Sequence, residues 1–215
     1  MTREPEIENL VNIVQDQMGP VDLFCSNAGV CFGEPGHAAS ASNDVWQTCW
    51  QVHVMAHVYA ARAVLPSMLE RGSGYFLQMS SAAGLLSLIG DAAYSTTKHA
   101  AVGLAESLAI THADDGINVS VVCPQYVATP MLGYAKGDPV PVKQSTITPQ
   151  QVADAVLKGI DEETFLILPH PEIAGYLQSK TANYDQWLGG MQKLRRKMLG
   201  ELGTTDLVEM HKLIM

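Results

Sequence analysis

Residues 75–98 read YFLQMSSAAGLLSLIGDAAYSTTK, and this stretch decides which fold the sequence favours. It opens with an apolar segment at 75–80, passes through small residues at 81–90, and enters a helical pattern after Asp91. A short apolar strand followed by a long helix is typical of α/β proteins, in which helices cover a buried parallel sheet. The apolar run predicts a strand at 75–80. Because aspartate commonly caps helices, we expect a helix from Asp91 to about His112.

The same alternation extends over the rest of the chain. Apolar runs predict further strands at 21–25, 117–124 and 164–168, and helical spacing predicts helices at 5–18, 44–65, 149–160, 171–180 and 184–199. Strands separated by such helices connect in a right-handed sense and form a parallel sheet flanked by helices. We therefore expect one α/β domain over residues 1–215, with a core at about 5–168 and a C-terminal helical extension at about 171–199.

Composition narrows the classes of function. The 215 residues are 47% hydrophobic and only 16% charged, which indicates a compact globular protein rather than a disordered one. The formal net charge of −9 disfavours nucleic acid and anionic membrane surfaces as partners. No apolar run reaches about 18 residues, so we expect no membrane-spanning helix.

The cysteines and the N-terminus bear on the cellular location. None of the four cysteines forms a C-x-x-C pair, and Cys25, Cys49 and Cys123 lie in apolar surroundings, so we expect buried, reduced thiols. Reduced thiols indicate a reducing compartment. The first ten residues, MTREPEIENL, are too polar for a signal peptide, and we expect a cytoplasmic protein.

A tyrosine and a lysine four residues apart, Tyr94 and Lys98, are the sharpest chemical feature of the sequence. On a helix the two side chains share a face, and an ammonium beside a phenol favours the phenolate. A phenol whose pKa is lowered in this way can exchange protons near neutral pH. The pair alone is weak evidence, because Tyr-x-x-x-Lys also occurs on many ordinary surface helices.

The ends of three consecutive predicted strands strengthen this interpretation. They carry small or polar loop-forming residues: SNAG at 26–29, SSAAG at 80–84 and CPQYVATP at 123–130. Open α/β sheets bind ligands at the carboxyl ends of their strands. We therefore expect these segments to meet Tyr94 and Lys98 in one site at that edge of the sheet.

Taken together, these segments resemble the short-chain dehydrogenase/reductase family. The matching pieces are, in order, DLFCSNAG at 22–29, AARAVLPSM at 60–68, Ser81, Tyr94 with Lys98, and CPQYVATPM at 123–131. Each piece is modest, whereas their order and spacing over residues 5–168 are specific. The resemblance implies a Rossmann-like fold and an oxidoreductase that uses NAD or NADP to interconvert an alcohol and a ketone or aldehyde, both small molecules.

The resemblance also implies roles for the matching residues. Tyr94 would be the general acid and base, Lys98 would lower the pKa of Tyr94 and bind the nicotinamide ribose, and Ser81 would polarise the substrate oxygen. Two groups would hold the cofactor: Asn27, Ala28 and Gly29 on the adenosine side, and Pro124, Tyr126, Val127 and Thr129 around the nicotinamide. A homodimer or homotetramer is also implied, because the two long helices of such proteins usually pack against a partner copy.

Two positions depart from the family pattern. His53 stands where the family usually has an asparagine that anchors a water near the lysine, so His53 is also a catalytic candidate. Histidine can donate and accept hydrogen bonds, but beside the Lys98 ammonium we expect it to stay neutral at pH 7. Gln125 replaces the usual glycine after Pro124, so the turn there loses the conformational freedom of glycine.

The largest departure lies on the amino-terminal side. The family begins with a strand, a glycine-rich turn and a helix that hold the cofactor pyrophosphate, and no such glycine pattern occurs in this sequence. We therefore expect an N-terminally truncated sheet in which 21–25 forms an open edge strand. Two explanations stay open: the sequence starts at an internal methionine of a longer enzyme, or it is a short form that serves as an oligomerisation or interaction module.

Other chemistries fit the residues less well. His53 and His57 have the spacing of a zinc pair, but no glutamate lies between them and no third ligand is evident, so we expect no metal site. A serine hydrolase would need G-x-S-x-G after a strand, whereas Ser81 lies in SSAAG. The loop at 130–148 and the helices at 171–199 are expected to cover the substrate pocket.

Overall fold

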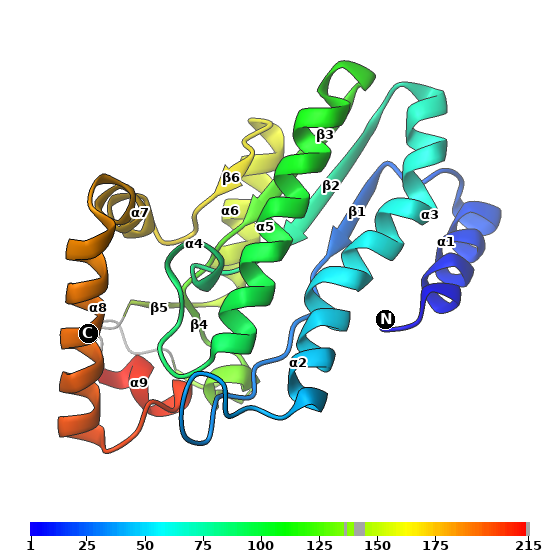
Figure 1. Cartoon of the computed structure of the whole chain (residues 1–215). Coiled ribbons are helices and arrows are strands. Elements are labelled where there is room, and N and C mark those ends of the chain that lie inside the picture. The colour runs from blue at the N-terminus through cyan, green and yellow to red at the C-terminus, as the bar shows by residue number, and fades with distance from the viewer. Residues whose placement is uncertain (136, 140–144, 214–215) are drawn as a thin grey trace.

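The computed structural model describes residues 1–135, 137–139 and 145–213. Four parallel strands form the main sheet, in the order β1 (Leu23–Ser26), β2 (Gly74–Met79), β3 (Ile117–Val122) and β6 (Leu166–Ile167). The carboxyl ends of β1, β2 and β3 lie at one edge, because Ser26 pairs with Gln78 and Met79 pairs with Val122. The predicted α/β fold with a parallel sheet flanked by helices is confirmed (Figure 1).

Helices connect and flank these strands. Along the chain they are α1 (Glu4–Met18), α2 (Asn43–Trp50), a π-helical turn (Gln51–Met55), α3 (Ala56–Arg71), α4 (Ala83–Leu86), α5 (Ala92–His112), α6 (Pro149–Asp161), α7 (Glu172–Ala182), α8 (Tyr184–Leu202) and α9 (Leu207–Leu213). There are also short 3-10 turns at Ala113–Asp115 and Pro130–Leu132, and a small parallel pair, β4 (Tyr126–Val127) with β5 (Thr146–Ile147).

Side chains alternate along the strands and so build two apolar layers. Phe76, Val119 and Val121 are buried in one layer together with residues of α3 and α5. Leu77 and Val122, each one position further along its strand, pack with α6 on the other face. Figure 1 shows α5 in front of the sheet and α6 behind it. A parallel sheet covered on both faces offers its carboxyl edge to ligands.

Helix starts follow the capping signals of the sequence. Asp91 caps α5, because its carboxylate accepts a hydrogen bond from Tyr94 N at 2.9 Å. Thr148 caps α6 in a reciprocal arrangement with Gln151, and Pro149 occupies the first turn, where its missing N–H costs nothing. The starts of the helices that flank the site are therefore encoded locally.

The predicted end of the long helix at residue 65 is wrong. The helix is interrupted by the π-helical turn and then continues through Pro66 to Arg71. Val64 and Met68 are fully buried on either side of Pro66, and this packing outweighs the hydrogen bond that proline removes. Gly72 ends the helix at a φ of 64°, a conformation that favours glycine.

β1 lies at one end of the sheet and has only β2 as a neighbour. Its position as an edge strand agrees with the sequence prediction. The prediction that Cys25 is buried is wrong, because on this edge strand both Cys25 and Leu23 are exposed. Cys49 and Cys123 are buried free thiols, as expected.

The C-terminal extension runs further than the predicted 171–199. α8 continues to Leu202, and α9 adds a last helix whose Met210 is buried. Lys180 of α7 donates a hydrogen bond to Leu85 O at 2.5 Å and so ties the extension to α4. In Figure 1 the extension stands at one side of the molecule, and α1 lies at the other. Among the described residues, no helix is long and apolar enough to cross a membrane.

Candidate functional site

A large cavity of about 1760 Å³ opens at the carboxyl ends of the strands. The residues proposed from the sequence to act on substrate or cofactor line it together, with one exception: Asn27, Ala28, Gly29, Ser81, Tyr94, Lys98, Pro124, Tyr126, Val127 and Thr129. The exception is His53, which is fully buried behind the wall. Residues that span about a hundred positions in sequence thus share one cavity, as the strand order requires.

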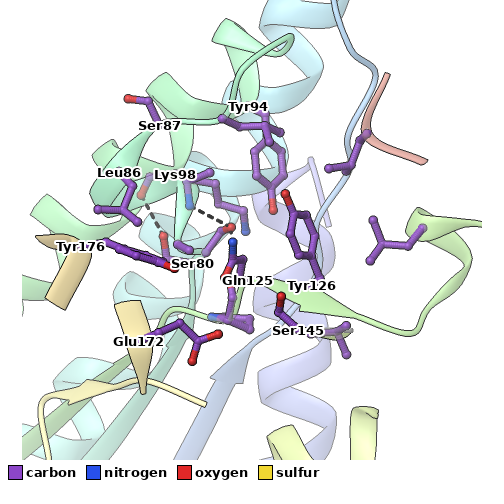
Figure 2. Close-up of a pocket in the computed structure, with 18 of the residues that line it drawn as sticks. Ser80, Leu86, Ser87, Tyr94, Lys98, Gln125, Tyr126, Ser145, Glu172 and Tyr176 are labelled. Atoms are coloured by element: carbon purple, nitrogen blue, oxygen red, sulfur yellow. Dashed lines mark hydrogen bonds between the residues drawn. The ribbon is translucent and has the colours of Figure 1, made fainter. Parts of the chain in front are cut away.

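Tyr94 lies in the first turn of α5, held there by the Asp91 cap. Figure 2 shows its phenol pointing into the cavity toward Tyr126. The ring packs edge-on against the His53 imidazole, with the two centroids 5.3 Å apart. The Lys98 ammonium lies 5.6 Å from the centre of the same ring. The phenol is therefore fixed on both sides while its hydroxyl faces the cavity.

The expected lowering of the Tyr94 pKa is wrong for the protein without ligands. Burial raises the pKa of Tyr94 well above its ordinary value, and the neighbouring Ser81 hydroxyl offsets only part of this rise. The Lys98 ammonium lies over the ring rather than at the hydroxyl, which weakens its effect on the phenolate. The Tyr94 phenol accordingly keeps its hydrogen at neutral pH.

Lys98 lies one helical turn after Tyr94 and is 2% exposed. Its ammonium donates a hydrogen bond to Met79 O at 2.9 Å, and its other two hydrogens find no acceptor among the residues of 1–135, 137–139 and 145–213. Burial lowers the pKa of Lys98 to about 8, so the group stays mostly protonated at pH 7. A side chain at Gly29 would place its Cβ 3.6 Å from Lys98 Nζ, so glycine keeps the space beside the ammonium open.

Two adjacent serines, Ser80 and Ser81, follow β2, and the first of them contacts α5. Ser81 Oγ accepts from Ala83 N at 3.1 Å and lies 3.4 Å from Pro124 O, to which it donates. Ser80 Oγ donates to Lys98 O at 2.9 Å. The approach is close enough that a Cβ on Gly84 would lie 2.7 Å from the same carbonyl, so only glycine fits there. The serine loop is thus clamped against the helix that carries Tyr94 and Lys98.

His53 joins two segments through direct hydrogen bonds. Its Nε2 accepts a hydrogen bond from Val30 N at 3.0 Å, so its Nδ1 carries the proton and donates to Thr97 Oγ1 at 2.8 Å. Thr97 in turn donates to Ala93 O. Burial, and then the Lys98 charge, lower the pKa of His53 to about 3. The prediction of a neutral histidine agrees with this arrangement.

Replacing His53 with asparagine should flatten the dependence of stability on pH. The folded-state pKa of about 3 lies below the unfolded value, so acidification protonates the unfolded chain first and stability falls as pH drops through about 6.5. Between pH 7 and pH 5 the wild type should lose about 2 kcal/mol through this residue, and His53→Asn should not. Urea unfolding at both pH values measures the difference, with exposed His37→Asn as control. Equal losses in wild type and His53→Asn would contradict the assignment.

Asp91 does not line the cavity but holds segments that carry the site, whereas the sequence identified it only as a helix cap. One oxygen caps α5, and the other accepts from Gly33 N at 2.8 Å, Phe32 N at 3.2 Å and Cys31 Sγ at 3.3 Å. This buried carboxylate therefore fastens the loop after β1 to the helix that carries Tyr94. The partners of its second oxygen lie about sixty residues away in sequence, and no local pattern reveals them.

Gln125 stands where glycine was expected, without backbone strain. Outside glycine, the described residues with positive φ are Ser87 and Glu163, so Gln125 has an ordinary conformation. The next residue, Tyr126, begins the short pairing of β4 with β5, and Ala128 N donates to Ile147 O at 2.9 Å. The turn is held by hydrogen bonds rather than by glycine.

The far wall of the cavity comes from the C-terminal extension. Its lining side chains are mainly apolar: Trp187, Met191, Leu194 and Met198 of α8, and Leu207, Met210 and Leu213 of α9. The prediction that this extension covers the pocket agrees with these positions, although it identified no individual residues. The expected covering loop at 130–148 lies partly outside the described residues; Met131, Leu132 and Ser145 of its described part line the cavity.

Comparison with known proteins matches residues 1–139 to the family described as short chain dehydrogenase. The chain belongs to this family. The D-beta-hydroxybutyrate dehydrogenase of Rhizobium meliloti is 31% identical over 167 residues, which are 77% of this chain and 63% of the relative. The ketoacyl reductase HetN of Nostoc is 31% identical over 159 residues, which are 74% of this chain and 55% of the relative. The chain thus spans less than two thirds of the length of these curated relatives.

A solved structure supports the same fold. A short-chain dehydrogenase from Streptomyces avermitilis superposes with a TM-score of 0.73 at 27% identity, covering 91% of this chain and 77% of that one. Among the described residues of this chain, no group of three histidine, cysteine, aspartate or glutamate side chains is placed to hold a metal ion.

Proposed function

We propose that this family member is an NAD(P)-dependent oxidoreductase that interconverts an alcohol and a ketone or aldehyde. The observation that carries the proposal is the convergence of Ser81, Tyr94 and Lys98 on one wall of the cavity. A protonated phenol, a neighbouring hydroxyl and a buried ammonium together suit the protonation of a carbonyl oxygen during reduction.

The proposed chemistry assigns one task to each side chain. Ser81 turns its hydroxyl hydrogen from Pro124 O to the substrate oxygen, and so orients that oxygen toward the Tyr94 phenol. Tyr94 gives its proton to that oxygen as the carbonyl is reduced, and takes it back in the reverse direction. The Lys98 ammonium stabilises the phenolate that remains, which is the step where lowering of the Tyr94 pKa is needed. A bound nicotinamide cofactor supplies or accepts the hydride.

The nicotinamide end of such a cofactor fits the residues present. Gly29 leaves space beside Lys98, whose two remaining ammonium hydrogens can bind ribose hydroxyls, and Pro124, Tyr126, Val127 and Thr129 line the adjoining wall. The choice between NAD and NADP stays open in the proposal. A Burkholderia phymatum family structure is a complex with NAD, and one from Sphingobium yanoikuyae is a complex with NADPH.

The 215-residue chain should bind NAD or NADP only weakly, with a dissociation constant in the millimolar range or above. Its sequence has no glycine-rich turn at a helix N-terminus, the arrangement that binds the pyrophosphate. Calorimetry on the purified chain measures this affinity. Micromolar binding would contradict the prediction, and would mean that another segment or a partner copy provides the phosphate site.

The substrate is proposed to have an apolar body. Trp187, Met191 and Leu194 line the same cavity as the catalytic candidates, and such apolar surfaces bind hydrocarbon groups. The proposal is tested by incubating the chain with NADH or NADPH at millimolar concentration and a series of aliphatic and aromatic ketones and aldehydes, while following reduced-nicotinamide absorbance. Turnover that rises with apolar size supports it, and no oxidation with any member of the series would overturn it.

A homo-oligomer is also proposed, on the strength of exposed apolar side chains on the long helices. Trp50 at the end of α2 is 42% exposed, and Ile110 of α5 is 81% exposed. Burial of such side chains against a second copy would stabilise a dimer. If the chain binds no cofactor but self-associates, the alternative of an oligomerisation or interaction module is favoured instead.

A further inference from the structure

His170 lies between β6 and α7, outside the residues that the sequence marked as candidates. The side chain is 2% exposed and does not line the cavity itself. Its Nδ1 accepts a hydrogen bond from Gln125 N at 3.1 Å. Its Nε2 lies 2.9 Å from Ser145 O and 3.2 Å from Tyr126 O. One imidazole therefore joins the segment after β3 to the residue that precedes β5.

The partners of the ring determine its protonation state. A backbone N–H can only donate, so Nδ1 must be unprotonated, and the two carbonyls can only accept, so Nε2 must carry the hydrogen. A neutral imidazole in this tautomer satisfies every partner. A protonated ring would place two N–H groups against each other at Gln125. Burial lowers the pKa of His170, an effect that Ser145 O and the Glu172 carboxylate offset in part, so the neutral form is favoured.

The backbone that His170 holds is part of the cavity wall. Gln125, Tyr126 and Ser145 all line the cavity, and Figure 2 shows them near one another, below Tyr94. The pairing of β4 with β5 begins at Tyr126 and Thr146, directly beside these contacts. His170 thus joins the start of β4 to the residue before β5, through Tyr126 O and Ser145 O. It also gives the Gln125 N–H a partner at the position where a glycine turn was expected.

We propose that His170 is a positioning residue, a neutral imidazole clip that fixes the backbone of Gln125 and Tyr126 where the nicotinamide side of the cofactor binds. The clip is a property of the folded chain alone. The effect of these hydrogen bonds on cofactor binding rests on the proposed function. The two parts can therefore be tested separately, and the first needs neither cofactor nor substrate.

Two substitutions separate the hydrogen bonds from the volume of the ring. His170→Leu keeps an apolar side chain of related size and removes every hydrogen bond. His170→Gln keeps one acceptor and one donor at comparable reach. His112→Leu serves as the matched control. It removes one histidine hydrogen bond, to Asp115, at the C-terminal end of α5.

Amide hydrogen exchange at Gln125, read by NMR, tests the clip without any ligand. His170→Leu should accelerate exchange of this amide by roughly 10- to 100-fold, and His170→Gln and His112→Leu by much less. Nitrogen-15 labelling of the wild-type histidines should show the hydrogen of His170 on Nε2. An Nδ1–H tautomer, or equal exchange at Gln125 in wild type and His170→Leu, would overturn the clip.

Affinity for NAD and NADP, measured by NMR titration at millimolar concentration, tests whether His170 supports cofactor binding. We expect His170→Leu to weaken binding by roughly tenfold and His170→Gln to restore most of it. If His170→Leu accelerates exchange at Gln125 but leaves the affinity unchanged, the clip exists and the positioning role is overturned. If the wild type binds neither cofactor, the proposed function fails and the positioning role falls with it, whereas the exchange result decides the clip alone.

Discussion

Tyr94→Phe should reduce turnover by roughly 10²- to 10⁴-fold while the chain stays folded, because the substitution removes the proton donor and nothing else. The Tyr94 hydroxyl faces the cavity, and burial keeps it protonated at neutral pH. Steady-state rates at saturating carbonyl and millimolar cofactor measure the loss, and circular dichroism verifies the fold.

Tyr75→Phe is the matched control for this change. Tyr75 lies on β2 away from the cavity, and its hydroxyl is hydrogen bonded to Ser120 Oγ at 2.7 Å. The control removes a hydroxyl from a tyrosine that does not line the cavity and should leave the rate nearly unchanged. A loss below tenfold in Tyr94→Phe, or an equal loss in both variants, would show that Tyr94 is not the proton donor.

Asp91→Ala should destabilise the chain by about 3–5 kcal/mol, because one carboxylate satisfies donors from two segments. The cap of α5 and the bonds to Phe32 N and Gly33 N are lost together, and the three backbone N–H groups are left without acceptors. The loop after β1 should also detach from α5. Urea denaturation measures the change in the free energy of unfolding.

Ser42→Ala provides the comparison for a simple cap. Ser42 accepts a single hydrogen bond, from Val45 N, at the exposed start of α2, and its loss should cost about 1 kcal/mol. If Asp91→Ala costs no more than Ser42→Ala, the carboxylate does not organise the loop after β1, and its role is limited to capping.

Features encoded over a few neighbouring residues were predictable from the sequence. The apolar run at 75–80 and the Asp91 cap depend on local spacing, and both agree with the structure. The convergence of Ser81 and Lys98 on one cavity follows from strand order. Such features are recoverable because strand, cap and turn preferences act over short distances.

Features that depend on distant contacts were not predictable. His170 reaches Gln125 across 45 residues, and Asp91 reaches Gly33 across 58, so neither partner leaves a local pattern. The Tyr94 pKa follows from burial, which the spacing to Lys98 does not reveal. Cys25 lies in an apolar run that resembles a buried strand, and only the order of the sheet places it at an exposed edge.

The central claim is that this cavity protonates and reduces a carbonyl group, and transfer of deuterium tests it most directly. The chain is incubated with NADH or NADPH carrying deuterium at the transferable C4 position and with an apolar ketone, and the product is analysed by mass spectrometry. We expect the wild type to form an alcohol with one deuterium on its carbinol carbon, and Tyr94→Phe to form less of it by roughly 10²-fold or more. Absence of deuterated alcohol with either cofactor, or its undiminished formation in Tyr94→Phe, would contradict it.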